Sequence, residues 1–255
     1  MVEIKTDIQM DAMREAGRVV ARALAAARDA AGVGVSLLEL DTAAHEVLRA
    51  AGASSPFLGY HPEFAPTPFP AVACVSVNDA IVHGIPNSYR LRDGDLVSVD
   101  FGAILDGWVG DSAISFTVGR ARPEDVRLIS TAYEALEAGI AAAVVGNRIG
   151  DIAHAIGTVC RGAGYGIPDG FGGHGVGRQM HEDPGVPNEG RRGRGMVLRH
   201  GMVLAIEPML IADGTDDYYP AADGWTLRTV TGVRAAHAEH TVAVTDAGPR
   251  ILTRV

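Results

Sequence analysis

An internal repeat is the feature that most limits how this chain can fold. Residues 34–52 align without gaps on residues 146–164 at an offset of 112, and glycines match at both ends of the alignment. Farther along, residues 91–100 align on residues 198–207 at an offset of 107. Two matches at nearly the same offset indicate a duplicated helix–helix–strand unit. Such a duplication predicts a pseudo-twofold fold in which each half contributes a carboxylate to a central cleft.

Four helices are predicted, two at the start of each half. Thr6 with Gln9, and Ser36 with Glu39, have the spacing of a capping box. Pro123 suits the first turn of a helix. After Thr6, apolar residues recur at helical spacing. The expected helices run from 6 to 30, from 36 to 52, from 123 toward 146, and over roughly 149–161.

The composition excludes several classes of protein. The chain has 22 basic and 31 acidic residues and a net charge of −9, which argues against DNA or another polyanion as the main partner. Its first residues do not resemble a secretory signal, and no apolar stretch approaches the roughly 20 residues of a membrane span. Cys74 and Cys160 are expected to be free thiols in apolar surroundings. We therefore expect a cytoplasmic protein, with the basic segment GRRGRG at 190–195 in a solvated loop.

The segment FGGHGVGRQMHEDP, residues 171–184, combines four glycines with two histidines seven positions apart. A phosphate-binding loop is excluded because its third glycine position falls on Arg178 or Met180. A helical zinc site is excluded because it needs histidines four positions apart, and because a glycine-rich segment will not hold a helix. His174 and His181 therefore need an explanation from the rest of the chain.

Residues 95–116 are predicted to form two strands around an Asp-Gly dipeptide at 106–107, a strong hairpin signal. With a two-residue loop, Gly102 faces Asp111. Asp100 and Asp111 then lie on one face of the sheet as diagonal neighbours, about 7–8 Å apart at the backbone. A three-residue loop would place these two carboxylates on opposite faces. A shared metal site at this hairpin therefore depends on its register.

Acids at the ends of apolar runs recur along the chain. Asp100 ends the run LVSVD, Glu207 lies in MVLAIEPM, and Glu239 opens EHTVAV. One such acid alone is usually explained by an edge position or a salt bridge. These three acids and Asp111, however, have no matching lysine or arginine in the same segments. Four carboxylates and one imidazole can neutralise two divalent cations, and such oxygen-rich sites suit manganese, iron, cobalt or zinc.

Taken together, the motifs resemble those of the type I methionine aminopeptidases. The resemblance covers essentially the whole chain, and the motifs that carry it are HGIP, VDFG-x7-GD, GGHGVGRQMHEDP, AIEP and EHT. It implies the α+β pita-bread fold, also called the creatinase/aminopeptidase fold, in which two pseudo-twofold-related αβ halves surround a central antiparallel sheet. We therefore expect one catalytic domain, residues 1–255, with repeat halves at approximately 6–118 and 119–250.

The resemblance also implies the roles of the polar residues. Two divalent metal ions (cobalt, manganese, iron or zinc) would activate a water molecule, and five residues would bind them: Asp100, Asp111, His174, Glu207 and Glu239. Asp111 and Glu239 would bridge the ions. Glu207 would also act as general base. His83 and His181 would contact the substrate and stabilise the tetrahedral intermediate without binding metal.

Methionine recognition needs an apolar pocket with a soft wall. The family pattern implies that this pocket is formed by Phe57, Tyr60, Cys74, Met180 and Trp225. The sequence between Tyr60 and Cys74, HPEFAPTPFPAVA, is longer and richer in proline than the family commonly shows. The shape of the pocket rim near Phe64 and Phe69 is therefore left open.

The other histidines are expected to be structural, because a lone histidine usually is. They stand at positions 45, 61, 154, 200 and 237. His240 follows Glu239 on a strand and should point to the opposite face. The glycines beside His174 are expected to let the backbone turn tightly and approach the cleft closely.

Two other classes of function remain as alternatives. A Xaa-Pro aminopeptidase or prolidase would share the five ligands, but such enzymes usually carry a substantial domain before the catalytic one. Type II methionine aminopeptidases carry an insertion for which 255 residues are too few. A pita-bread protein that binds ribosomes or RNA without catalysis is expected to have lost ligands, whereas all are present. The resemblance favours a monomeric hydrolase that removes N-terminal methionine from nascent proteins, prefers a small second residue and contacts the ribosome transiently.

Overall fold

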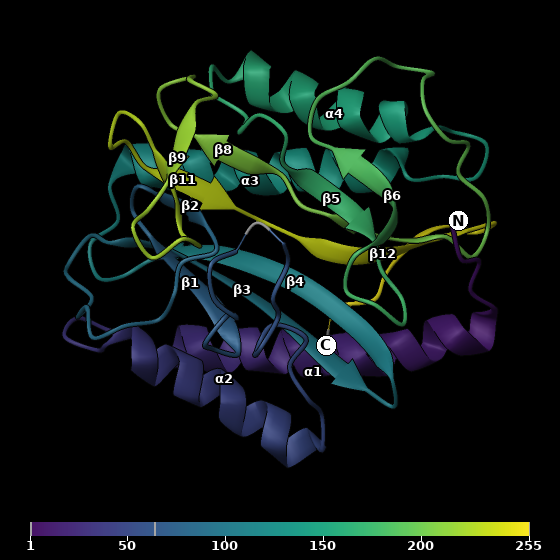
Figure 1. The fold of residues 1–255 in the computed structure, drawn as a ribbon. Helices are drawn as coiled ribbons and strands as arrows, with labels where there is room; N and C mark the ends of the chain where they lie inside the picture. Colours follow the sequence, from purple (N-terminus) through teal and green to yellow (C-terminus); the bar gives the residue numbers. More distant parts are fainter. Residues whose placement is uncertain (1, 64, 255) are drawn as a thin grey trace.

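Two pairs of helices enclose the strands of the molecule, one pair on each side (Figure 1). The computed structural model describes residues 2–63 and 65–254. Its helices are α1 (Asp7–Ala30), α2 (Leu37–Ala51), α3 (Pro123–Ala142) and α4 (Ile149–Gly162). Its strands are β1 (Ala73–Val77), β2 (Ala80–Val82), β3 (Leu96–Leu105), β4 (Trp108–Thr117), β5 (Gly172–Gly175), β6 (Glu182–Pro187), β7 (Val203–Ile206), β8 (Met209–Ile211), β9 (Tyr218–Pro220), β10 (Leu227–Thr229), β11 (Ala235–His237), β12 (His240–Thr245) and β13 (Gly248–Ile251). Within the described ranges, no helix has both the length and the apolar character needed to cross a membrane.

The helices begin where the capping signals predicted. The Thr6 hydroxyl accepts the N–H of Gln9 at 3.3 Å, and the Gln9 side chain accepts the N–H of Thr6 at 2.8 Å. Before α2, the Glu39 carboxylate accepts the N–H of Ser36 at 2.8 Å, and α2 is followed by Gly52 with a φ of 65°. These bonds satisfy N–H groups that have no partner inside the helix. The predicted proline also opens α3.

The duplicated segments make equivalent hydrogen bonds in both halves. Before α2, the N–H of Gly34 donates to the carbonyl of Leu91 at 2.7 Å. Before α4, the N–H of Gly146 donates to the carbonyl of Leu198 at 3.0 Å. Both glycines have left-handed φ angles, 90° and 92°, which glycine adopts without steric cost. Two isolated bridges obey the same offsets, Ser36 with Arg90 and Arg148 with Val197. The repeat in the sequence is therefore a repeat in the fold.

Strands β3 and β4 form the predicted hairpin with a two-residue turn. Both turn residues, at 106–107, have positive φ angles of 50° and 74°, as a type I′ turn requires. In this register Gly102 pairs with Asp111, and Asp100 pairs with Ala113. The predicted register is confirmed, and it places the two aspartates on the same face of the sheet because they lie two pairs apart.

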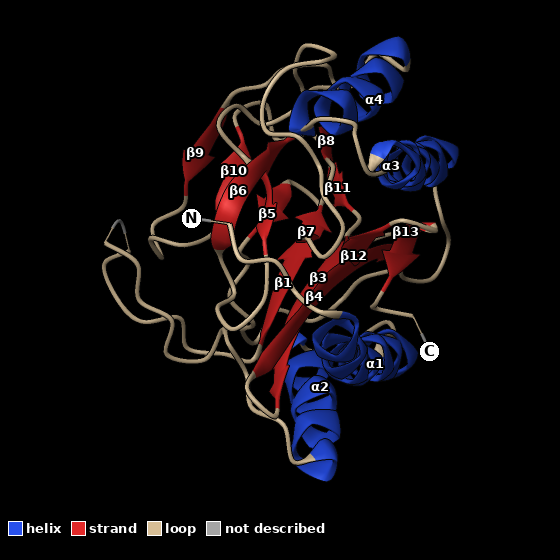
Figure 2. Cartoon of the chain, turned by 90° about the vertical axis from the view of Figure 1, so that its right-hand side faces the viewer, coloured by secondary structure: helices blue, strands red, loops and turns tan. Residues whose placement is uncertain are grey.

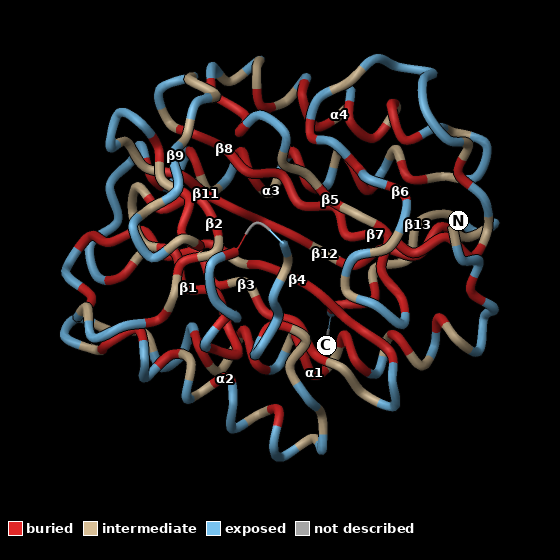
Figure 3. The backbone as a smooth tube through the Cα atoms, viewed as in Figure 1, coloured by how far each residue is buried: buried red, intermediate tan, exposed pale blue. Residues whose placement is uncertain are grey.

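Each helix pair covers its own side of the strands. Helices α1 and α2 pack against β1, β3 and β4 through a buried apolar cluster that includes Val20 and Phe101. Helices α3 and α4 pack against β7, β8, β11 and β12 through a second cluster that includes Ile152 and Ile206. Figure 2, turned by 90°, shows the strands between the two helix pairs. Figure 3 shows that the central strands are mostly buried, whereas the outer faces of the helices are exposed.

Hydrogen bonds join β4 to the segment around residue 239 and so connect the two halves. The N–H of Asp111 donates to the hydroxyl of Thr241 at 3.0 Å, and this hydroxyl donates to the Asp111 carbonyl at 2.7 Å. The N–H of Glu239 donates to the carbonyl of Ala113 at 3.0 Å. These bonds link the sheet β1-β3-β4 to the five-stranded sheet β13-β12-β7-β5-β6. They also hold Asp111 and Glu239 side by side.

Candidate active site

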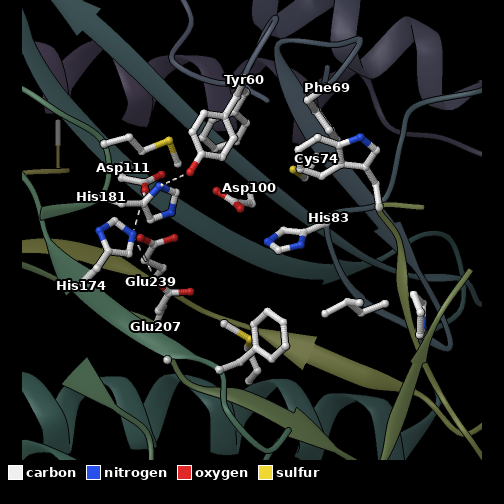
Figure 4. A pocket seen from close by; sticks show the side chains of 18 of the residues that line it. Tyr60, Phe69, Cys74, His83, Asp100, Asp111, His174, His181, Glu207 and Glu239 are labelled. Atoms are coloured by element: carbon white, nitrogen blue, oxygen red, sulfur yellow. Dashed lines mark hydrogen bonds and ion pairs between the residues drawn. The ribbon is translucent and has the colours of Figure 1, made fainter. Parts of the chain in front are cut away.

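One cavity of about 590 Å³ gathers every site residue predicted from the sequence (Figure 4). Its lining includes the five predicted ligands, the two cleft histidines and the five pocket residues: Phe57, Tyr60, Cys74, His83, Asp100, Asp111, His174, Met180, His181, Glu207, Trp225 and Glu239. In Figure 4, Asp111, Glu207 and Glu239 lie near His174 and His181, Asp100 lies in the middle of the view, and Phe69 and Cys74 lie on the opposite side. The cavity therefore has a polar end and an apolar end.

Strand ends and the hairpin bring the acids together. Asp100 and Asp111 face the cavity from β3 and β4, Glu207 directly follows β7, and Glu239 directly precedes β12. From β5, Nε2 of His174 lies 3.6 Å from Oδ2 of Asp111 and 3.5 Å from Oε1 of Glu207. One ligand atom from each of Asp111, His174 and Glu239 can be chosen so that all three lie within 4.8 Å of one another. These three residues are close enough to share one cation.

The orientation of His174 is set by a backbone bond. Its Nδ1 lies 2.9 Å from the carbonyl oxygen of Gly175, so Nδ1 carries the proton and donates it. This leaves the lone pair of Nε2 directed at the carboxylates, which is the tautomer that a metal-binding histidine uses. Burial, assisted by the nearby His181, lowers the pKa of His174 to about 4. The imidazole is therefore neutral at pH 7 and able to act as a ligand.

Among the described residues, none of the four carboxylates has a lysine or arginine partner. Burial raises the pKa of Asp111 to about 7. Burial raises the pKa of Asp100, Glu207 and Glu239 well above their usual values, and repulsion from Asp111 adds to this effect. Within the described part of the chain, the ion pairs of Asp111, Glu207 and Glu239 are to histidines alone.

Three of these acids have buried oxygens without a hydrogen-bond partner among the described residues. They are Oδ1 of Asp100, Oδ1 of Asp111 and Oε1 of Glu239. Buried carboxylates in this state are costly as anions unless a cation lies among them. A set of carboxylates with one neutral imidazole suits a divalent metal ion. The residues present therefore fit a metal centre.

His83 and His181 line the same cavity. Nδ1 of His181 lies 3.2 Å from the Tyr60 hydroxyl, and the His181 ring centre is 4.3 Å from that of His174. His83 has a φ of 59°, uncommon for a residue with a side chain, and its ring meets Trp225 edge-on at 6.4 Å. Burial lowers the pKa of His83 to about 4 and also lowers the pKa of His181. Both rings are therefore predominantly neutral at pH 7.

The apolar end of the cavity is walled by aromatic rings and sulfur atoms. Phe57, Phe69, Cys74 and Trp225 form a buried cluster, and Met180 packs against it. Phe69 meets Phe57 edge-on at 6.4 Å and meets Trp225 edge-on at 5.1 Å, the geometry that aromatic pairs prefer. Cys74 is a buried free thiol, as predicted. The wall offers the soft apolar surface that an unbranched thioether side chain would fill.

The proline-rich segment after Tyr60 builds part of this wall. Phe69 is 3% exposed and therefore lies inside the pocket wall. The N–H of Phe69 donates to the Tyr60 carbonyl at 2.8 Å, and the indole N–H of Trp225 donates to the Thr67 carbonyl at 2.9 Å. No motif covers this segment, so the sequence alone leaves the role of Phe69 open. Phe64 lies outside the described residues.

The glycines beside His174 do not form the predicted tight turn. They form strand β5, which lies between β6 and β7. A Cβ atom on Gly173 would collide with the carbonyl of Ala205 in β7, and one on Gly175 would collide with the carbonyl of Asp183 in β6. The prediction of a turn is wrong for this segment. Glycine is needed because the neighbouring strands approach closely, and this approach brings His174 next to Glu207.

His237 belongs to the polar cluster although no sequence motif includes it. Its side chain is buried, and its Nε2 lies 3.6 Å from Oε2 of Glu207 and 4.0 Å from Oε2 of Glu239. Its position two residues before Glu239 could have indicated a shared face, because strand side chains alternate. Other lining residues without a motif are Phe171, Met209, Tyr218 and Leu227.

The remaining histidines lie away from the cavity, as expected. His240 bonds to the Thr253 hydroxyl at 2.9 Å, and His200 bonds to Asp7 at 3.2 Å. His45 and His154 are exposed on helices. None of these side chains is among the residues that line the cavity.

Comparisons with known proteins agree with this geometry. Residues 11–246 match Metallopeptidase family M24. Methionine aminopeptidase 1 of Mycobacterium tuberculosis is 55% identical over 252 residues, which cover 96% of this chain and 92% of that protein. Methionine aminopeptidase of Clostridium acetobutylicum is 44% identical over 254 residues, 99% of each chain. The solved structure of methionine aminopeptidase from Thermotoga maritima matches with a TM-score of 0.95 at 38% identity and covers 100% of both chains. A prolidase from Pyrococcus horikoshii shares the fold, with a TM-score of 0.77 at 22% identity over 63% of its length.

Proposed function

The chain belongs to metallopeptidase family M24, with the pita-bread fold of its type I methionine aminopeptidases, and we propose how its residues release N-terminal methionine. It is a metal-dependent aminopeptidase that hydrolyses the peptide bond after an N-terminal methionine. One observation carries the assignment of roles. The buried carboxylates, the neutral histidines and the apolar pocket open into a single cavity.

Five residues would hold two divalent metal ions: Asp100, Asp111, His174, Glu207 and Glu239. Asp111 and Glu239 are assigned as bridging residues, because the hydrogen bonds between β4 and the segment before β12 hold them side by side. When bound, the metal ions lower the pKa of a water molecule and polarise the scissile carbonyl. The oxygen-rich ligand set suits manganese, iron, cobalt or zinc.

Glu207 is the residue that we assign as general base. Its carboxylate lines the cavity, with Oε1 3.5 Å from Nε2 of His174. Its backbone carbonyl accepts a bond from Asn188 at 3.0 Å, which fixes the main chain at this point. A carboxylate beside the attacking water can accept its proton. Glu207 can therefore take the proton of the attacking water and pass it to the leaving amine.

His83 and His181 are assigned to the substrate. We assign the Tyr60 hydroxyl as the donor to Nδ1 of His181, 3.2 Å away. Nε2 of His181 then carries the hydrogen and can donate it to the oxygen that becomes negative in the tetrahedral intermediate. His83 lies beside the aromatic wall, against Trp225. From there it can hydrogen-bond the peptide group of a substrate whose side chain occupies the pocket.

The methionine side chain is assigned to the apolar end. Phe57, Cys74 and Trp225 supply its buried wall, Met180 packs against them, and Tyr60, which is 37% exposed, also lines the cavity. Phe69 is added to the residues predicted from the sequence. A preference for a small second residue follows from the family and is part of the proposal.

A peptide panel combined with a metal titration tests this function. The purified enzyme, loaded in turn with manganese, cobalt, iron or zinc, should release methionine from Met-Ala-Ser and act more slowly on Met-Leu-Ser. It should leave Ala-Pro-Ser intact. Activity should saturate with two equivalents of metal. Preferential cleavage of Ala-Pro-Ser would instead favour the Xaa-Pro peptidases, which share the fold, and saturation at one equivalent would contradict the dinuclear site.

Other properties of the enzyme stay predictions. We propose one catalytic domain over residues 1–255, with halves at approximately 6–118 and 119–250, acting as a monomer in the cytoplasm. Nascent proteins are its proposed substrates, and it would contact the ribosome transiently without binding DNA. The basic segment at 190–195 is largely exposed, with Arg192 near Asp151 at 3.9 Å. It is the first place to seek a ribosome contact by crosslinking.

A further inference from the structure

Nε2 of His237 is buried and has no hydrogen-bond partner among the described residues. The His237 residue as a whole is only 1% exposed. A buried imidazole nitrogen without a partner costs free energy, so its surroundings should supply one. Two acceptors face it, Oε2 of Glu207 at 3.6 Å and Oε2 of Glu239 at 4.0 Å. Glu207 is the nearer of the two.

Hydrogen bonds hold the main chain of His237 in place. The N–H of His237 donates to the Ser115 hydroxyl at 3.0 Å, and this hydroxyl donates to the His237 carbonyl at 2.7 Å. On the other side, His237 pairs with Met209 of β8. Met209 lines the cavity, but His237 does not. The imidazole therefore reaches Glu207 from behind the cavity wall, where it cannot touch a substrate.

The two oxygens of Glu207 face different histidines. Oε1 lies on the side of His174, at 3.5 Å, and Oε2 lies on the side of His237. We propose that His237 is a positioning residue that donates its Nε2–H to Oε2 of Glu207, which keeps Oε1 directed at the metal centre. This role rests on the proposed function. A movement of about half an ångström brings 3.6 Å into hydrogen-bond range.

Loss of this donor should impair the reaction more than substrate binding. Without the hydrogen bond to Oε2, the Glu207 carboxylate can rotate. Mutation of a residue that hydrogen-bonds a metal ligand typically lowers activity or metal affinity about 10–100-fold. His237→Leu, which keeps the bulk and removes the donor, should lower kcat by about 10–100-fold and leave KM within about threefold. His237→Gln retains an N–H donor and should recover most of the lost kcat.

A matched variant separates this role from general damage to the fold. His240→Gln changes a half-buried histidine beside Glu239 whose ring bonds to Thr253, away from the cavity. It should keep kcat near the wild-type value. Equal losses in His237→Leu and His237→Gln, or an unchanged kcat in His237→Leu, would overturn the positioning role.

A second measurement does not depend on activity or on a variant that folds. Long-range ¹⁵N–¹H NMR of the zinc-loaded wild-type enzyme, labelled at histidine, reports which ring nitrogen carries hydrogen. His237 should carry its hydrogen on Nε2, whereas His174 should carry it on Nδ1. A zinc-bound Nε2 in His237 would make it a ligand and refute the proposal, as would a hydrogen on Nδ1. If His237 has the expected tautomer but methionine peptides are not cleaved, the proposed function is wrong, whereas the proposed hydrogen bond from His237 to Glu207 is still supported.

Discussion

The hydroxyl of Tyr60 lies 3.2 Å from Nδ1 of His181, and the two ring centres are 5.5 Å apart. Tyr60→Phe keeps the ring and removes this bond. Because a typical hydrogen bond contributes about 1 kcal/mol, we expect kcat to fall about five- to tenfold with little change in KM. Steady-state kinetics on Met-Ala-Ser would measure both. Tyr219→Phe, at a position that is 45% exposed, is the matched control. An unchanged kcat in Tyr60→Phe would show that His181 does not need this contact.

Glu207 should matter for both chemistry and metal binding. Glu207→Gln removes the negative charge and the proton acceptor while keeping the shape of the side chain. We expect kcat to fall by about 10²–10⁴-fold, the usual contribution of a general base. Metal content, measured on the same sample, should also fall. Glu46→Gln, on the exposed face of α2, should change neither quantity.

The metal-free protein should lose stability as the pH rises. Burial raises the pKa of Asp111 to about 7 in the folded state, above the value of about 3.9 for an unfolded chain. The proton is therefore held more tightly in the folded state. Its stabilising effect is complete below about pH 4 and is lost as the pH rises toward about 7. Glu239, whose pKa burial also raises, acts in the same direction.

Bound metal should prevent this loss of stability at higher pH, because the metal ions neutralise the carboxylates in place of the protons. Thermal unfolding near pH 5.5 and near pH 8, with metal or with a chelator, measures the difference. We expect metal to raise the melting temperature by at least about 4 °C more at the higher pH. An equal increase at both pH values would contradict the buried, metal-neutralised carboxylates.

Phe69 should contribute to methionine binding. Phe69→Leu removes its edge-on contacts with Phe57 and Trp225. We expect KM for Met-Ala-Ser to rise about tenfold, because a changed apolar wall alters binding by about 1–3 kcal/mol. Metal content should stay the same. Leu58→Ala, just before this segment and 52% exposed, should leave KM unchanged, and a similar effect of both variants would argue against a specific wall.

Gly17 should be required for packing of α1. A Cβ atom there would collide with the carbonyl of Leu252. Gly17→Ala is expected to lower the free energy of unfolding by about 1–3 kcal/mol, despite the better helix propensity of alanine. Gly162→Ala, at the end of α4 with open space around it, should be neutral or stabilising by up to about 1 kcal/mol. Chemical denaturation of both variants measures the contrast.

The sequence allowed much of the fold to be predicted because its signals are local. Thr6 and Ser36 precede their helices by one residue, and the dipeptide at 106–107 sets the register of its hairpin. The acids were found because an ionisable residue at the end of an apolar run is costly without a partner. Asp100 and Asp111 therefore face the same cavity, as their register predicted.

The features that were missed depend on contacts between distant segments. Gly173 is required because β7 passes close to it, and no local pattern reveals that approach. Phe69 belongs to the pocket wall because Trp225, far away in the sequence, packs against it. His237 faces Glu207 only after β8 and β11 have paired. In each case the tertiary neighbour decides the role of the residue.

The hydrogen bonds between β4 and the segment around residue 239 have a consequence during protein synthesis. Asp100 and Asp111 belong to the first half, but Glu239, which is held beside Asp111, comes late in the second. A chain still growing on the ribosome cannot assemble the proposed ligand set until residue 239 has been translated and has left the exit tunnel. A chain truncated before that point would lack peptidase activity, however well its first half had folded. The proposed ligand set is therefore complete only after most of the second half has been made.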